Sequence, residues 1–222
     1  MIRLENVTFS FKDDKDVLIK DLSFSISKGE CVALTGPSGI GKSTIANIIA
    51  GFVKPCLGRV FVEDIDNTGT PSKRVILLSQ ESDLFPWQTV RQHIMFVLRH
   101  VNFADAKTAE AKMKELLQLV NLQEFEGKFP FQLSGGMKKR LSLARALAIA
   151  PDLLILDEIF SSLDMELKKV LYEDLKKIWG AKKTTILLLS HDQEEVRFLC
   201  KRNIVLKPNR PTGIERIEDY SL

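Results

Sequence analysis

The sequence predicts an α/β fold with an inserted α-helical subdomain, and three observations carry this prediction. Strand-like apolar runs alternate with helical patterns toward both ends of the chain. The apolar run "CVALTG" leads straight into the glycine-rich stretch "GPSGIGKST", and helical spacing follows it. Between about 89 and 149 the pattern is helical, and Pro151 stops it.

The first part of the chain reads as strands around one helix. Residues 2–11 and 22–26 alternate apolar and polar side chains, as strands half buried against a core do. Residues 59–63 and 74–78 predict further strands, so we expect an antiparallel part near the N-terminus. The helix after the glycine-rich stretch should end near Gly51.

The rest of the chain divides into the helical insert and a return to alternation. Helical patterns cover 89–101, 105–120 and 137–150. The strand "LLILDE", a helix near 164–178 and the strands "TTILLLS" and "NIVL" then follow. We expect a single domain over 1–222, in which 1–80 and 151–222 form the α/β core and about 81–150 carry the insert.

Composition narrows the class of protein. The 32 basic and 29 acidic residues nearly balance, which gives no electrostatic case for nucleic acid as a ligand. No apolar run is long enough to span a bilayer, and no signal peptide is visible, so we expect a cytoplasmic protein. Cys31, Cys56 and Cys200 form no C-x-x-C pair, which predicts neither a zinc site nor a disulfide framework; Cys31 reads as a core residue.

The stretch "GPSGIGKST", residues 36–44, matches the phosphate-loop pattern G-x-x-x-x-G-K-[ST] in full. Its glycines let main-chain N–H groups converge on phosphate oxygens at the start of a helix. We expect Lys42 to reach the β- and γ-phosphates, Ser43 to ligate Mg²⁺ and Thr44 to bond the α-phosphate. The residues expected to bind ATP here are Gly36, Pro37, Ser38, Gly39, Ile40, Gly41, Lys42, Ser43 and Thr44.

Asp157 and Glu158 end the apolar run "LLILDE", where a buried parallel strand would deliver them beside the phosphate loop. An Asp there can hold Mg²⁺, and the neighbouring Glu can deprotonate the attacking water. Any buried strand must end in polar residues, so the Asp-Glu pair indicates a catalytic site only in combination with the phosphate loop. The combination predicts a P-loop nucleoside triphosphatase with a mixed sheet flanked by helices.

A third motif resembles a family signature. "LSGGMKKR", residues 133–140, is similar to the LSGGQ signature of ATP-binding cassette (ABC) ATPases. Gln80 matches the family's Q-loop glutamine, which reaches Mg²⁺ and the attacking water, and Asp164 lies in "SSLD", which resembles the D-loop. His191 matches the switch histidine that contacts the γ-phosphate, and Phe11 occupies the place of the aromatic residue that stacks on adenine.

The resemblance implies that two cassettes bind two ATP molecules between them, head to tail. Ser134, Gly135 and Gly136 would then contact the γ-phosphate of ATP held by Lys42 of the other copy. On ATP binding we therefore expect a homodimer with two equivalent sites. A simpler interpretation, in which "LSGG" only caps the next helix, leaves its paired glycines unexplained.

Three residues depart from the family pattern. Met137 replaces the glutamine of LSGGQ at a position that points away from the γ-phosphate. Phe11 stands where tyrosine or tryptophan is commoner, and it keeps the aromatic face. Ser162 replaces alanine in the D-loop. All positions expected to be catalytic, namely Lys42, Gln80, Glu158 and His191, are present.

The stretch "LFPWQTV", residues 84–90, resembles the same region of nitrate, sulfonate and taurine importer cassettes. In importers this region helps to form the groove for a coupling helix of the membrane subunit. Alternatively, Phe85 and Trp87 pack into the local core, and both interpretations can hold. His93 and His100 read as helix-surface residues rather than ligands.

The resemblance implies an ATPase subunit that energises import through separate permease subunits at the inner face of the membrane, together with a substrate-binding protein. An exporter or lipoprotein-release cassette shares every catalytic motif and stays an alternative. A soluble ABC ATPase acting on nucleic acid is a second one, although the charge balance argues against it.

Overall fold

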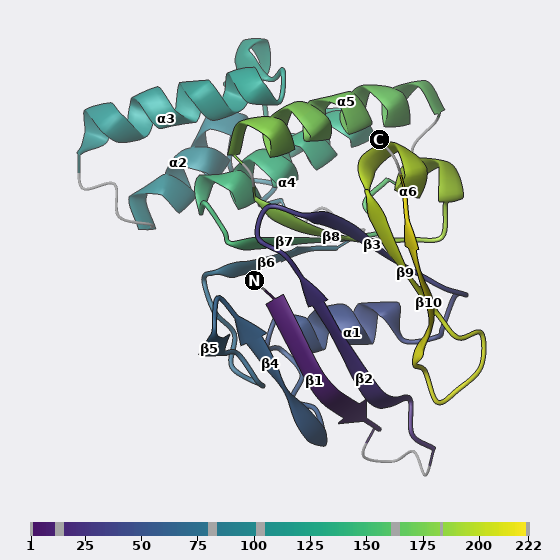
Figure 1. Ribbon diagram of the computed structural model, residues 1–222. Coiled ribbons are helices and arrows are strands. Elements are labelled where there is room, and N and C mark those ends of the chain that lie inside the picture. The colour runs from purple at the N-terminus through teal and green to yellow at the C-terminus, as the bar shows by residue number, and fades with distance from the viewer. Residues whose placement is uncertain are drawn as a thin grey trace. The chain divides into compact units, whose positions relative to one another are not determined.

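The computed structural model describes residues 2–11, 16–79, 84–100, 105–160, 165–182 and 184–220, and Figure 1 shows its elements. The chain forms two compact units. Unit 1 comprises Met1–Leu77, Asp152–Glu158 and Lys182–Leu222. Unit 2 comprises Leu78–Pro151 and Ile159–Ala181. The prediction that all of these segments form a single domain stays a prediction.

Unit 1 contains two sheets. The first is a four-stranded antiparallel sheet in the order β2-β1-β4-β5, built from β1 (Ile2–Phe9), β2 (Ile19–Ile26), β4 (Leu57–Val62) and β5 (Ile65–Asp66). The second has the order β10-β9-β3-β8-β7-β6, and its strands are β3 (Cys31–Thr35), β6 (Val75–Leu78, whose last residue falls in unit 2), β7 (Leu153–Asp157), β8 (Thr185–Ser190), β9 (Arg202–Leu206) and β10 (Ile214–Asp219).

The pairing directions make the second sheet mixed. Strands β7, β8, β3 and β9 run parallel to one another, whereas β10 is antiparallel to β9. Every residue of β3 and β8 is buried, as in strands covered on both faces, while β2 alternates buried and exposed residues. The predicted α/β fold with a mixed sheet and an N-terminal antiparallel part is confirmed.

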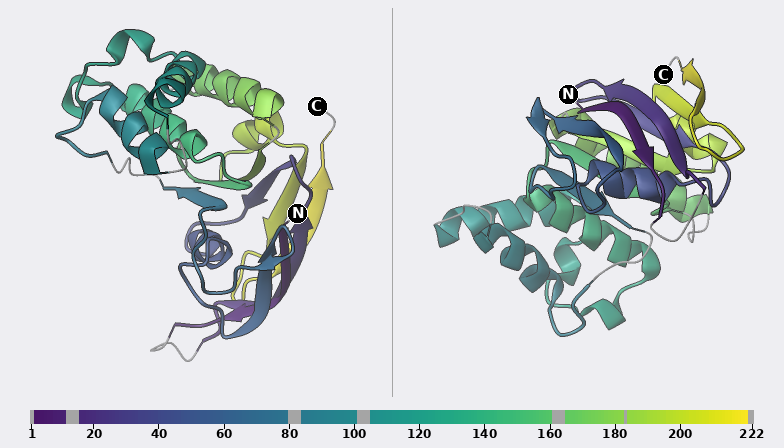
Figure 2. Two further views of the ribbon diagram at one scale, coloured as in Figure 1. Left: turned by 90° about the vertical axis from the view of Figure 1, so that its left-hand side faces the viewer. Right: turned by 90° about the horizontal axis from the view of Figure 1, so that it is seen from below.

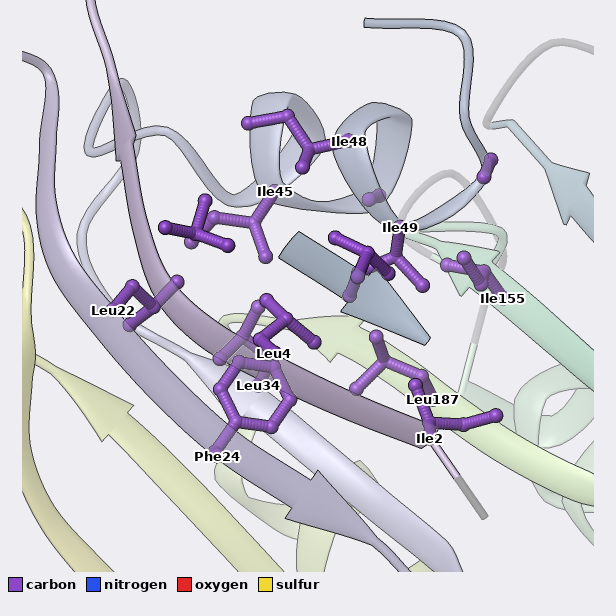
Figure 3. Packing of buried hydrophobic residues seen from close by; sticks show 14 of the residues in the cluster. Ile2, Leu4, Leu22, Phe24, Leu34, Ile45, Ile48, Ile49, Ile155 and Leu187 are labelled. Carbon is purple, nitrogen blue, oxygen red and sulfur yellow. The ribbon is translucent and has the colours of Figure 1, made fainter. Parts of the chain in front are cut away.

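The core of unit 1 lies where the two sheets meet α1 (Lys42–Ile49). Figure 3 shows Ile45 and Ile49 of α1 pointing toward Leu4 of β1 and Leu34 of β3, all of them buried. Each such side chain stabilises the fold by about 1.5–3 kcal/mol through removal of apolar area from water. This packing fixes α1, and with it the loop that precedes α1, against the sheet.

The predicted end of this helix is confirmed. Ala50 caps α1, and Gly51 follows with a φ of 80°, the left-handed conformation that commonly ends helices. A Cβ at Gly51 would lie 2.4 Å from the carbonyl oxygen of Thr70, so only glycine fits here. The short helix α6 (Gln193–Leu199) follows β8, and the side chain of Asp192 caps it.

Unit 2 is helical, and its helices gather into one group in Figure 2. They are α2 (Val90–His100), α3 (Ala106–Leu119), α4 (Gly135–Ala148) and α5 (Met165–Lys182, whose last residue falls in unit 1), with 3-10 turns at Gln123–Phe125 and Pro130–Gln132. The side chain of Asp105 caps α3, and α3 buries Ala109 and Met113. Arg140 of α4 pairs with the buried Asp174 of α5 at 3.3 Å, which ties these helices together.

Two cysteines of unit 1 meet in its core. Cys31 is 2% exposed, which confirms its prediction as a core residue, and its Sγ lies 3.4 Å from that of Cys200. Both are free thiols. The hydrogen bond with Cys31 and the burial of Cys200 raise the pKa of Cys200, so it stays protonated at neutral pH.

Candidate active site

The phosphate loop connects the fully buried strand β3 to α1, both in unit 1. Gly39 and Gly41 have φ values of 75° and 107°, in the left-handed region that glycine tolerates. Among the described residues, no side chain caps the first turn of α1, because Gly41 occupies the N-cap position. Within the described ranges, the first main-chain N–H groups of the helix therefore lack a capping side chain, as in an anion-binding helix start.

Lys42 lies under this loop. Its side chain is only 6% exposed, and its Nζ donates hydrogen bonds to the carbonyl oxygens of Gly36 at 2.9 Å and Pro37 at 3.1 Å. A buried ammonium group is costly unless it has such partners. The loop thus holds a positive charge at its centre, where a phosphate group would find it.

The ends of two further parallel strands bring a carboxylate and an imidazole to Lys42. An Oε1–Nζ distance of 3.7 Å separates Glu158 from Lys42, and the same Oε1 lies 3.3 Å from Nδ1 of His191. Glu158 has a φ of 49°, and its N–H donates to Leu189 O at 3.1 Å. This bond holds the turn after β7 against β8, so the side chains converge at the carboxyl edge of the sheet.

Asp157 precedes Glu158 at the end of β7 and is half-buried. The pKa of Asp157 is raised above its ordinary value, mainly by burial and further by the charge of the neighbouring Glu158. A hydrogen bond with the Ser43 side chain and the charge of Lys42 act in the opposite direction. A half-buried carboxylate beside a hydroxyl offers two oxygen ligands of the kind that Mg²⁺ prefers. A cation there would also offset the cost of burying the carboxylate, so these residues fit the metal.

Phe11 follows β1 and exposes 51% of its surface. Phe9 supports it, because the two rings meet edge to face with centroids 5.1 Å apart. This contact holds the ring of Phe11 against the end of β1. An exposed aromatic ring on a fixed support can stack on a planar base.

The remaining predicted site residues lie in unit 2 or outside the described residues. Ser134 caps α4 by accepting a hydrogen bond from the N–H of Met137 at 3.3 Å, and Gly135 and Gly136 begin the helix. These three residues form the signature turn. Gln80 and Asp164 fall outside the described ranges.

The stretch after residue 83 forms an aromatic cluster in unit 2. Phe85 stacks on Trp87 at a centroid distance of 5.4 Å and on His93 at 6.0 Å, and Trp87 is 70% exposed. The prediction of a surface position is wrong for His93, which is 1% exposed. His93 accepts the N–H of Phe85 at 2.9 Å through Nε2, while its Nδ1 lies 2.8 Å from Thr89 O. Its burial satisfies the main chain of the preceding turn.

Sequence reasoning missed two residues that contact the phosphate loop. Arg210 and Thr212, in the connection between β9 and β10, donate hydrogen bonds to the carbonyl oxygens of Gly39 and Ile40. The stretch "KPNRPTG" that contains them reads as an ordinary turn. No sequence signal points from it to a loop about 170 residues earlier.

The fold and the geometry around Lys42 define a P-loop nucleoside triphosphatase. The family model described as "ABC transporter" matches residues 19–161. A taurine import ATP-binding protein, TauB of Pseudomonas fluorescens (strain Pf0-1), is 35% identical over 98% of this chain and 81% of its own length. The sulfate/thiosulfate import ATP-binding protein CysA 2 of Agrobacterium fabrum is 39% identical over 92% of this chain and 60% of its own.

Solved structures of ATP-binding cassettes have the same fold as this chain. The post-hydrolysis dimer of the ATP-binding cassette MJ0796 with ADP and Pi is similar over the full length of both chains, with a TM-score of 0.86 and 29% identity. The chain therefore belongs to the ABC transporter family and is an ATP-binding, ATP-hydrolysing subunit. In the part of the chain that the structure describes, no helix has the length and apolarity needed to cross a membrane.

Proposed function

We propose that the chain energises the import of a small solute, with Lys42, Glu158 and His191 at the centre of its ATPase site. The observation that carries the proposal is that Lys42, at the start of α1, and His191, after β8, both approach Glu158 Oε1, at 3.7 Å and 3.3 Å. The taurine and sulfate importers among its relatives support import over the exporter alternative. A sulfonate or a similar oxyanion is the class of solute that they favour.

Each residue has a role that follows from its chemistry. The N–H groups of the phosphate loop and Lys42 bind the β- and γ-phosphates, and the ring of Phe11 stacks on adenine. Ser43 and Asp157 would hold Mg²⁺, joined by Gln80, and the metal would neutralise charge on the phosphate oxygens. Glu158 takes the proton of the attacking water, and His191 orients Glu158 and the γ-phosphate.

The site is complete only with a second copy of the chain. Ser134, Gly135 and Gly136 of one copy contact the γ-phosphate bound to the phosphate loop of the other, with Asp164 at the same junction. The dimeric cassette structures among the solved relatives support this arrangement. A substrate-binding protein would deliver the solute to separate permease subunits. These subunits, contacted by the cassettes at the cytoplasmic face of the membrane, would use the closure of the dimer to move the solute.

Replacement of Glu158 by Gln tests the proposed base. The amide keeps the shape but cannot accept a proton, so steady-state hydrolysis should fall by at least about 100-fold while ATP binding persists. Sedimentation with Mg-ATP should then show a stable dimer. Glu194→Gln, which alters an exposed carboxylate on α6, is the control and should hydrolyse ATP normally. Turnover by Glu158→Gln near that of the control would remove Glu158 from this role.

A further inference from the structure

The connection between β9 and β10 lies beside the loop that leads into α1 (Figure 1). Thr212 is fully buried, and its Oγ1 donates to the carbonyl oxygen of Ile40 at 2.5 Å. Arg210 is exposed, and its Nη2 donates to the carbonyl oxygen of Gly39 at 3.0 Å. Two side chains of this connection thus contact two consecutive peptide units of the phosphate loop.

A phosphate cannot bond to the carbonyl oxygens of the loop, because both groups are hydrogen-bond acceptors, so these oxygens need donors from the protein. The carbonyl oxygens of Gly36 and Pro37 accept from Lys42, and that of Gly41 accepts from the N–H of Ile45 at 2.9 Å. Arg210 and Thr212 supply the donors for the carbonyl oxygens of Gly39 and Ile40. Because a peptide unit is planar, fixing the direction of its carbonyl oxygen also fixes the opposite direction of the next N–H group.

The connection is itself held by the start of β2. The N–H of Thr212 donates to Leu18 O at 2.7 Å, and the N–H of Lys20 donates to Thr212 O at 3.1 Å. The Leu18 side chain also faces Gly41, where a Cβ would lie 3.4 Å from its Cγ. The phosphate loop therefore packs against the start of β2 and the β9–β10 connection, all within unit 1.

We propose that Thr212 and Arg210 are positioning residues for ATP: they orient the phosphate loop so that its N–H groups face the phosphates before the nucleotide arrives. Binding then loses less conformational entropy than it would with a mobile loop. Arg210 adds a positive charge near the anion. This inference rests on the proposed role of the phosphate loop and assigns to the C-terminal part of the chain a share in nucleotide affinity.

The test measures dissociation constants of a fluorescent ATP and a fluorescent ADP for the isolated subunit, together with KM and kcat. Thr212→Val keeps the shape and removes the donor, so both dissociation constants and KM should rise about tenfold, the effect of one lost hydrogen bond. Thr212→Ser keeps the hydroxyl and should restore wild-type affinity. Arg210→Ala should raise both constants about threefold, because its hydrogen bond is exposed to water.

Matched controls separate positioning from general stability. Thr185 is also buried, and its hydroxyl accepts the N–H of Gly29 at 3.0 Å, away from the loop. Thr185→Val should lower the melting temperature comparably and leave nucleotide affinity within twofold of wild type. Arg216→Ala removes an exposed arginine from β10 and controls for Arg210.

The outcomes distinguish this inference from the proposed function. If Lys42→Ala loses nucleotide binding while Thr212→Val and Arg210→Ala bind like wild type, the positioning role is wrong and the proposed site stands. If Thr185→Val weakens binding as much as Thr212→Val does, the effect is one of stability and the inference is overturned. If Lys42→Ala binds ATP normally, the proposed function itself fails.

Discussion

The phosphate loop of unit 1 and the signature turn of unit 2 both set glycines at the start of a helix, but they treat that start differently. In the phosphate loop, glycines adopt left-handed φ angles, and no described side chain caps α1. In the signature turn, Ser134 caps α4 with its own side chain, and Gly135 and Gly136 are helical. One start leaves its N–H groups for a ligand, whereas the other already satisfies one of them.

The two turns differ in whether they can bind phosphate within one chain. The phosphate loop, with buried Lys42 beneath it, has the charge and the donors to bind phosphate within one chain. The signature turn has no charge of its own. Its Gly135 is exposed, and a Cβ added there would meet no described atom of another segment within 4 Å. We infer that the turn is a preformed, uncharged surface that acts only when a second cassette brings its nucleotide.

The two turns should respond most differently when the charge of Lys42 is removed. Lys42→Ala removes the buried ammonium group, so ATP affinity of the monomer should fall about 100-fold, as expected for a lost charge-assisted contact. Ser134→Ala should leave ATP binding by the monomer unchanged and cost about 1 kcal/mol of stability through the lost cap. Equilibrium binding under conditions that keep the chain monomeric measures both. Equal losses of affinity would show that the two turns do not differ in this way.

Replacing one glycine by alanine should have opposite effects on stability at the two turns. Gly41→Ala forces a side chain into a φ of 107° and should destabilise the subunit by about 1–3 kcal/mol. Gly135→Ala places Ala in a helix with space around it and should stabilise the subunit by up to about 1 kcal/mol. Yet the added methyl group should weaken ATP-dependent dimerisation. Urea titration and sedimentation would measure these effects, and intact dimerisation of Gly135→Ala would contradict the assigned role.

The aromatic cluster gives a third, smaller contrast within unit 2. Trp87 is 70% exposed, so replacing it by Ala should change stability by less than about 0.5 kcal/mol but weaken assembly with the permease. Basal ATPase activity should stay intact. Phe52→Ala, which alters a 61% exposed aromatic residue of unit 1, is the control. A fall in melting temperature without any loss of co-purification would favour the alternative that Trp87 packs into the local core.

His93 gives the smallest effect, and it depends on pH. The pKa of His93 is lowered below its ordinary value, mainly by burial and also by the charge of Arg145. The hydrogen bond with Thr89 opposes this shift only in part. The folded chain then binds fewer protons than the unfolded chain just below pH 6.5, so this part of the stability is present above that pH and is lost as the pH falls.

The pH dependence can be measured against a variant that does not titrate. Between pH 7.5 and 5.5, wild type should lose about 1 kcal/mol more than His93→Gln does, because the unfolded wild type binds a proton at His93 while the folded chain keeps this ring neutral as an acceptor for Phe85, and glutamine does not titrate. Parallel slopes for wild type and His93→Gln would refute the contribution of His93.

Local patterns predicted most of unit 1 because the relevant interactions are close in sequence. The phosphate loop needs a buried strand before it and a helix after it, and all three lie within residues 31–49. Likewise, a strand buried on both faces is visible as the apolar run before Asp157 and Glu158. The positions of these side chains beside Lys42 then follow from the parallel sheet.

Contacts between distant segments could not be predicted in the same way. His93 is buried because it accepts the main-chain N–H of Phe85, and the apolar pattern of its helix does not reveal that bond. Thr212 and Ile40 are 172 residues apart, so the support of the phosphate loop appears only when the sheet is assembled. Polar contacts to the main chain are not side-chain specific, and they leave little trace in a single sequence.

If the signature turn serves the nucleotide of the other chain, two different lesions should complement each other in a mixed dimer. Lys42→Ala damages the phosphate loop, and Ser134→Arg places a bulky cation in the signature turn, so each homodimer should be inactive. A mixed dimer concentrates both lesions in one site and leaves the other site complete. Mixing the two inactive proteins should therefore restore hydrolysis or, if the two sites are strictly coupled, occlusion of about one ATP per dimer.

Native mass spectrometry of the mixture shows whether heterodimers form, and assays of hydrolysis and ATP occlusion then show whether they are active. We expect heterodimers to form and at least one of the two activities to return. Heterodimers that neither hydrolyse nor occlude ATP would contradict it, because the signature turn would then not act across the interface.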